Sequence, residues 1–261
     1  MHPSTQRLLI DSIPGPRFKR YLDEADGDES LALALYEWNV DASAAVSSTM
    51  SAVEVALRDT FDRQLRTWNM SQGGGVEWIT HPEGVLAHIV RRTPNQSWVN
   101  RSPETALHPQ WWEAKARDSM KDHLGCVTKH SPTHDDLVSG LTFGTWCFLI
   151  PKPLRLGGRQ RAPQWTIWED ALNSRDNGCR GDAGFSASPA VAYHWCALLR
   201  YARNRASHLE PMLDVDELWR WHRTASRTIA SLSSGAETMV TGPARIPQVI
   251  RRRPRGRTST H

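Results

Sequence analysis

Cysteine is scarce in this chain, and the few cysteines form no recognisable pattern. The sequence has four among 261 residues, at positions 126, 147, 179 and 196, and no CxxC pair occurs. Small secreted proteins use closely spaced cysteines as a disulfide framework, so the sequence does not fit that class. We expect the protein to work in a reducing cytoplasm.

Long apolar runs are also missing. The longest, LTFGTWCFLI at residues 141–150, is far too short to cross a lipid bilayer and is followed by Pro151. The N-terminal segment MHPSTQRLLIDSIPGPRF lacks the uninterrupted apolar stretch of a signal peptide. The sequence therefore predicts no membrane segment and no secretion.

Net positive charge is confined to the C-terminal end. The formal net charge is +4 and the sequence pI is about 9.0, but the last 21 residues hold six arginines and no acid. The rest of the chain is slightly acidic, so the pI describes a tail and says little about the folded part. We expect residues 233–261 to form a disordered, arginine-rich tail.

Tryptophan is abundant where the other aromatic residues are few. The sequence has twelve Trp against five Phe and four Tyr. Much of the core must then be built from indole rings, whose N–H groups need hydrogen-bond partners when buried.

Helical periodicity dominates from residue 30 onward. Two helical runs are expected between Ser30 and Trp68, the second preceded by an N-cap region near Asp41 and Ser43. The glycine run at 73–75 should end the second helix. Its inward face is predicted from apolar residues at steps of three and four: Met50, Val53, Leu57, Phe61 and Leu65.

Further helices are expected over residues 85–92, 110–123, 165–173, 188–209 and 214–231. Pro189 suits the first position of a helix, and Pro211 limits that helix to about Leu209. The segment 141–150 should be buried, but its periodicity does not decide its type. The inward faces of the last two helices are predicted to carry Val191, Ala192, Trp195, Leu198, Leu199, Ala202 and Ala206, and then Leu218, Trp221 and Ile229.

These patterns predict an all-α fold, a helical bundle with long loop insertions near residues 69–110 and 151–187. We expect an N-terminal arm over residues 1–29, a helical domain over residues 30–232 and the basic tail over residues 233–261.

The string RNRASH, Arg203 to His208, concentrates reactive side chains at the end of a predicted helix. Histidine exchanges protons near neutral pH, arginine offers a fork of donors to phosphate, and Asn204 could orient either. These residue types suit metal-independent RNA cleavage. Arg203 and His208 lie roughly 140° apart around an ideal helix, so a second copy of the chain could complete the site. An ordinary charged helix end remains open, because the helix dipole favours cations there.

Three segments in the same order resemble a known family. The first carries Tyr36, Trp38 and Asn39 and then Glu54, Arg58 and Asp59, and the second carries Leu141, Phe143, Gly144 and Trp146. The third is the arginine-asparagine-x3-histidine motif at Arg203, Asn204 and His208. Together they span roughly residues 30 to 225 and resemble the Abi-like (AbiD and AbiF type) abortive infection proteins of bacteria, which belong to the HEPN superfamily. Asp59 stands where asparagine is common in that family.

The resemblance implies a HEPN-like helical bundle that dimerises, with the motifs of two subunits facing each other in a metal-independent ribonuclease site. It assigns Arg203 and His208 as catalytic, with Asn204 as the polar residue beside them. Arg205 and Ser207 are candidate substrate-binding residues. Glu54 and Arg58 are four residues apart on one helix, so we expect an ion pair that, with Asp59, supports the site.

A metal site is a weaker alternative. The string HLGCVTKHSPTH spaces His123, Cys126, His130 and His134 in a way that superficially suits zinc. It runs from a predicted helix into a proline-containing loop, and the similar family needs no metal. We therefore expect neither a metal nor a cofactor.

The sequence thus predicts a cytoplasmic endoribonuclease, a phage-defence or toxin-like effector with RNA as substrate and an antitoxin as a possible partner. The alternative is a non-catalytic RNA-binding or scaffold protein of the same fold. A third interpretation, a DNA-binding regulator that uses the basic tail, finds no convincing helix-turn-helix in support.

Overall fold

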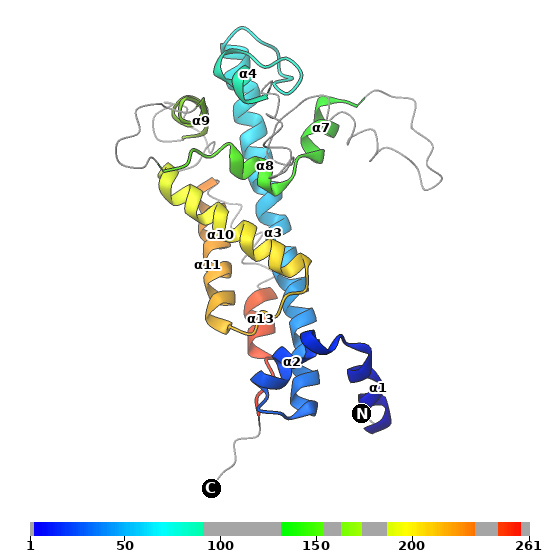
Figure 1. The fold of residues 1–261 in the computed structure, drawn as a ribbon. Coiled ribbons are helices and arrows are strands. Elements are labelled where there is room, and N and C mark those ends of the chain that lie inside the picture. Colours follow the sequence, from blue (N-terminus) through cyan, green and yellow to red (C-terminus); the bar gives the residue numbers. More distant parts are fainter. Residues whose placement is uncertain (1–2, 91–131, 154–162, 174–186, 233–244, 257–261) are drawn as a thin grey trace. The chain divides into compact units, whose positions relative to one another are not determined.

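The protein is built from helices wherever the structure describes it (Figure 1). The computed structural model describes residues 3–90, 132–153, 163–173, 187–232 and 245–256. These residues contain no β-sheet, which confirms the all-α prediction, and none of their helices is long and apolar enough to span a bilayer. The helices are α1 (Pro3–Ser12), α2 (Gly15–Glu24), α3 (Glu29–Ser71), α4 (Gly84–Val90), α7 (His134–Gly140), α8 (Phe143–Phe148), α9 (Pro163–Ile167), η2 (Trp168–Leu172), α10 (Pro189–Ser207), α11 (Val215–Leu232) and α13 (Arg245–Arg251).

The chain divides into two compact units. Unit 1 draws on residues 1–52, 201–226 and 238–261, and unit 2 draws on residues 53–200 and 227–237. Helices α3, α10 and α11 each contribute residues to both units. Both chain ends belong to unit 1, whereas the sequence suggested an arm and a tail on either side of one domain. The helix predicted over residues 110–123 lies outside the described residues.

One helix of 43 residues, α3, replaces the two predicted runs. The expected N-cap region was wrong: Asp41 is exposed and Ser43 is buried inside a continuous helix. No glycine or proline interrupts the backbone hydrogen bonds between residues 29 and 71. The predicted inward face is confirmed, since none of its five residues is more than 2% exposed.

The glycine run ends α3 as predicted. Gly73 has a φ of +89°, and the amides of Gly73 and Gly74 donate to the carbonyls of Met70 and Asn69 at 3.1 and 3.0 Å. This is a Schellman motif, in which a left-handed residue lets two amides close the last turn. The buried Asn69 side chain then binds three backbone groups of the following loop, the carbonyls of Gly75 and His81 and the amide of Glu83.

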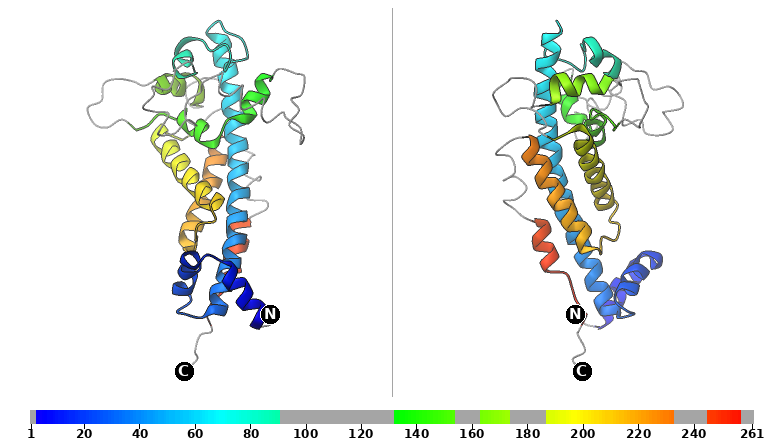
Figure 2. Two further views of the ribbon diagram at one scale, coloured as in Figure 1. Left: turned by 45° about the vertical axis from the view of Figure 1, so that its right-hand side comes forward. Right: turned by 90° about the vertical axis from the view of Figure 1, so that its left-hand side faces the viewer.

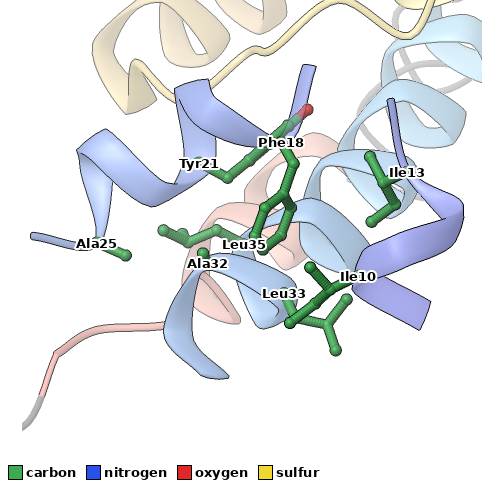
Figure 3. Close-up of a cluster of buried hydrophobic side chains, with 8 residues drawn as sticks. All are labelled: Ile10, Ile13, Phe18, Tyr21, Ala25, Ala32, Leu33 and Leu35. Carbon is green, nitrogen blue, oxygen red and sulfur yellow. The ribbon is translucent and has the colours of Figure 1, made fainter. Parts of the chain in front are cut away.

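Residues 3–24 contain α1 and α2 of unit 1. Their apolar side chains meet the start of α3 in a buried cluster of Ile10, Ile13, Phe18, Tyr21, Ala25, Ala32, Leu33 and Leu35 (Figure 3). The Tyr21 ring meets Tyr36 edge to face at 5.4 Å between centroids. Burial raises the pKa of the Tyr21 hydroxyl to about 12, so this group stays neutral within the cluster.

The prediction of a disordered tail was wrong for residues 245–256. They form α13 and an extended segment that packs alongside the start of α3 (Figures 1 and 2). Ile246 is fully buried, and the Nε1–H of Trp38 donates to the carbonyl of Val249 at 2.8 Å. Arg253 pairs with Glu24 and lies over the Trp38 ring. The prediction followed the arginine-rich composition and missed the apolar residues of α13, which are buried in unit 1.

In unit 2, the segment whose type was left open is the helix α8. The Oγ1 of Thr142 accepts the amide of Thr145 at 3.3 Å and caps the helix. Leu141, Phe143 and Trp146 are buried, and the Trp146 ring lies 6.4 Å from that of Phe61. The segment that resembles the Abi-like family is therefore a core element of this unit.

The remaining predicted helices are present with small differences. The run over residues 165–173 is α9 and the π-helical turn η2, and α4 packs against α9. On α10, Val191 is 40% exposed, and Trp195 and Leu198 are only half-buried, contrary to prediction. Val191 lies roughly 80° around the axis from the buried Leu199, at the edge of the apolar face. On α11 the predicted inward residues are buried.

Candidate functional site

The segment Arg203 to His208 forms the last turns of α10, in unit 1, and ends in a strained cap. The amides of Leu209 and Glu210 donate to the carbonyls of Ala206 and Arg205 at 3.1 and 3.0 Å, a second Schellman motif. Leu209 occupies the left-handed position with a φ of +50°, where α3 has Gly73. A side chain in this conformation costs roughly 1–2 kcal/mol. Other contacts must therefore hold the helix end in place.

Three side chains of this segment carry no partner among the residues that the structure describes. Arg203, Asn204 and His208 are exposed, and none of them makes a side-chain hydrogen bond or ion pair to the described part of the chain. Arg17 of α2 donates from Nη2 to the carbonyl of His208 at 3.1 Å, which fixes the backbone and leaves the imidazole free. Because α10 is regular up to Ser207, Arg203 and His208 keep their roughly 140° separation around the axis.

Arg205, in contrast, is held by several groups of the protein itself. Its guanidinium pairs with Glu217 at 2.7 Å and with Glu210 at 3.2 Å, and it donates to the carbonyl of Pro211. It also lies over the rings of Tyr201 and Trp221, at 5.6 and 5.9 Å from their centroids. Only 17% of the Arg205 side chain is accessible, so its contacts favour a structural role over substrate binding.

Ser207 is the other candidate substrate-binding residue. It is exposed, and its Oγ donates to the carbonyl of Arg203 at 2.9 Å. Hydroxyls that return a hydrogen bond to the preceding turn are common on helices. This bond closes the turn that carries Arg203, and the oxygen keeps lone pairs that can accept from a ligand.

Asn39 fixes the loop that follows His208. Its side chain is 1% exposed, and its Nδ2 donates to the carbonyl of Glu210 at 3.3 Å while its Oδ1 accepts the amide of Met212 at 2.7 Å. One amide therefore satisfies two backbone groups of this loop. The sequence offered one signal for this contact, a polar residue on the apolar face of α3. In the sequence, Asn39 belongs only to the segment that carries the family resemblance.

The predicted supporting residues lie on the part of α3 that belongs to unit 2. Arg58 and Glu54 form the expected ion pair at 3.3 Å, with 27% and 21% of their side chains accessible. Asp59 is exposed and pairs with Arg63 at 2.9 Å. The structure therefore groups Arg203, Asn204, Arg205, Ser207 and His208 in unit 1 and Glu54, Arg58 and Asp59 in unit 2.

Unit 2 also contains a buried ionic network around Asp62. One carboxylate oxygen accepts the Nε1–H of Trp78 at 2.7 Å and meets Nε2 of His134 at 3.0 Å, and the other accepts from Arg66 at 2.7 Å. Burial alone would raise the pKa of Asp62, but the hydrogen bonds from His134, Trp78 and Arg66 lower it below the usual value. His134, one of the four residues of the zinc alternative, is thus bound to a carboxylate.

The other three residues of that alternative, His123, Cys126 and His130, lie outside the described residues. Among the residues that the structure describes, no group of three or more metal-ligating side chains occurs. Cys147 and Cys196 are buried and free, with Sγ of Cys147 at 3.8 Å from the carbonyl of Cys196. Cys126 and Cys179 also lie outside the described residues.

Charge at the end of α10 is unbalanced in favour of cations. Arg205 pairs with both Glu210 and Glu217, whereas Arg203 and Arg17 have no acidic partner in the described residues, so three arginines here face two glutamates. The helix end therefore offers positive charge, an imidazole and an amide to solvent. This combination suits a phosphate group, which arginine binds through paired donors.

Comparisons with known proteins add no assignment. No protein-family model, curated protein or solved structure matches this chain. The functional interpretation therefore depends on the geometry of α10 and on the sequence motifs.

Proposed function

We propose that the protein is a metal-independent endoribonuclease of the HEPN type, with Arg203, Asn204 and His208 as its reactive side chains. The observation that carries the proposal is the contrast between Arg205 and its neighbours at the end of α10. Arg205 is consumed by contacts within the protein, while these three neighbours have no partner in the described residues. Side chains with a purely structural purpose would be expected to find acceptors nearby, as Arg205 does.

The chemistry follows from the residue types. Neutral His208 removes the proton of a ribose 2′-hydroxyl, and the 2′-oxygen attacks the adjacent phosphorus. The bond from phosphorus to the 5′-oxygen breaks, and that oxygen takes up a proton from a protonated imidazole. The products are a 2′,3′-cyclic phosphate and a 5′-hydroxyl. Arg203 stabilises the charge that grows on the phosphate oxygens, and Asn204 orients either partner.

The proposal includes a homodimer. Arg203 and His208 of one chain point in different directions around α10, so a second copy that places its own motif opposite would complete the pair. A second His208 in such a dimer would supply the proton for the leaving oxygen. We further propose a cytoplasmic, phage-defence or toxin-like effector, for which an antitoxin is the corresponding partner.

The test measures cleavage of labelled RNA in EDTA. We expect the wild type to produce 2′,3′-cyclic phosphate ends, and His208→Ala and Arg203→Ala each to lower the rate roughly 10²-fold or more. Arg220→Ala, an exposed arginine of α11 without a partner in the described residues, is the matched control and should keep full activity. Equal rates in all four proteins would refute the proposal. RNA binding without cleavage of any RNA class would favour the non-catalytic scaffold.

A further inference from the structure

Tyr201 is an exposed aromatic side chain next to the proposed site that none of the preceding roles explains. Half of the residue, 50%, is accessible to solvent, although it lies on a helix with a buried apolar face. It precedes Asn204 by three residues and His208 by seven, so the three share one side of α10. From Tyr201 to His208 the helix rises about 10 Å, a distance that a base near the cleaved phosphate can span.

The Tyr201 ring is held in a fixed position. Trp221 meets it edge to face at 6.3 Å, and the Arg205 guanidinium lies 5.6 Å from its centroid and donates from Nη1 to its hydroxyl at 3.4 Å. Arg205 is itself fixed by Glu217 and by the carbonyl of Pro211. A ring fixed on one side and open on the other loses little side-chain freedom when a flat ligand covers it.

We propose that Tyr201 is a stacking platform for an unpaired RNA base, and that the substrate class is therefore single-stranded RNA or a single-stranded loop. This inference rests on the proposed function: of its reactive residues, Asn204 and His208 lie on the same side of the helix as Tyr201, and Arg203 lies roughly 160° away. Bases in a duplex are stacked on each other and cannot cover a protein ring, whereas unpaired bases stack readily on tyrosine. Arg205 acts here as a positioning residue, because it orients the ring without facing the substrate.

The test measures binding in a His208→Ala background, which keeps RNA intact. The probes are a fluorescein-labelled 12-nucleotide single strand of mixed sequence, the same strand annealed to its complement, and a strand of equal length made of abasic ribose units. Loss of one base stack should weaken binding of the single strand roughly 5- to 150-fold in Tyr201→Ala and Tyr201→Leu. Tyr201→Phe should bind normally. Binding of the duplex and the abasic strand should not change.

Two controls keep the test decisive. Val191→Ala removes a similarly exposed apolar side chain elsewhere on α10 and should bind all probes normally. Tyr201→Leu preserves apolar bulk against Trp221, so its urea midpoint should match that of the wild type. Equal weakening on all three probes, or no weakening on the single strand, would overturn the stacking role, as would failure of every probe to bind. Specific binding of the single strand without cleavage would instead remove the proposed nuclease and leave the platform.

Discussion

Replacement of Asn39 by alanine removes both hydrogen bonds that hold residues 210–212 of unit 1 against α3. The amide of Met212, a residue that is 1% exposed, then loses its acceptor at 2.7 Å, and a stranded buried donor costs about 1–3 kcal/mol. The carbonyl of Glu210 belongs to an exposed residue and can bind water, so its 3.3 Å bond adds less than about 1 kcal/mol. The higher helix propensity of alanine returns about 0.5 kcal/mol.

The expected loss in the free energy of unfolding is therefore about 0.5–3.5 kcal/mol. Urea denaturation followed by circular dichroism measures it, with the slope against urea unchanged. Asn39→Asp separates the two hydrogen bonds, because a carboxylate still accepts from the amide of Met212 but cannot donate to the carbonyl of Glu210. Glu37→Ala, an exposed residue of the same helix, should change the free energy by less than about 0.5 kcal/mol. A loss below about 0.5 kcal/mol for Asn39→Ala would refute the assigned contacts.

Three further predictions concern stability. The pKa of Asp62 is lowered on folding, so its ionised carboxylate contributes fully to the free energy of unfolding at neutral pH, and this contribution is lost as the pH falls below about 4. The destabilisation caused by Asp62→Asn should therefore be largest at pH 7 and should shrink in acid. Leu209→Gly should be more stable than Leu209→Ala by about 1 kcal/mol, since both remove the side chain and only glycine accepts the positive φ freely; the reverse order would contradict the strain assigned to this cap. Gly74→Ala should cost roughly 1–3 kcal/mol in the same urea denaturation, because its Cβ would lie 2.6 Å from Nδ2 of Asn69. Gly75→Ala, whose Cβ would have no neighbour nearer than 4.0 Å, should be close to neutral.

Local patterns predicted the helices well where one apolar face repeats. The inward residues of α3 recur every three or four positions, and the glycine run after residue 72 supplies the left-handed conformation that a Schellman motif requires. Pro189 is the first residue of α10, where its fixed φ suits a helix, and Pro211 follows the helix because its ring cannot continue one. These features depend on neighbours within one helical turn, so the sequence displays them directly.

Contacts between distant segments could not be predicted in this way. The helix α13 has too few apolar residues to form a strong periodic pattern. It is held by the hydrogen bond from Trp38, and the residues just after it are held by the pair of Arg253 with Glu24. The fixed position of Arg205 likewise depends on Glu217, twelve residues away, and on the loop between them. The sequence therefore indicated which residues of RNRASH are reactive in type, but not which of its two arginines the protein would use for itself.

The contribution of α13 to unit 1 also bears on the order of folding during synthesis. The core of this unit combines α1 and α2 with residues 201–226 and with α13. The chain is synthesised from the N-terminus onward, so Trp38 gains its acceptor only after Val249 has been added. Unit 1, and with it the end of α10, should therefore become fully folded only after α13 has left the ribosome.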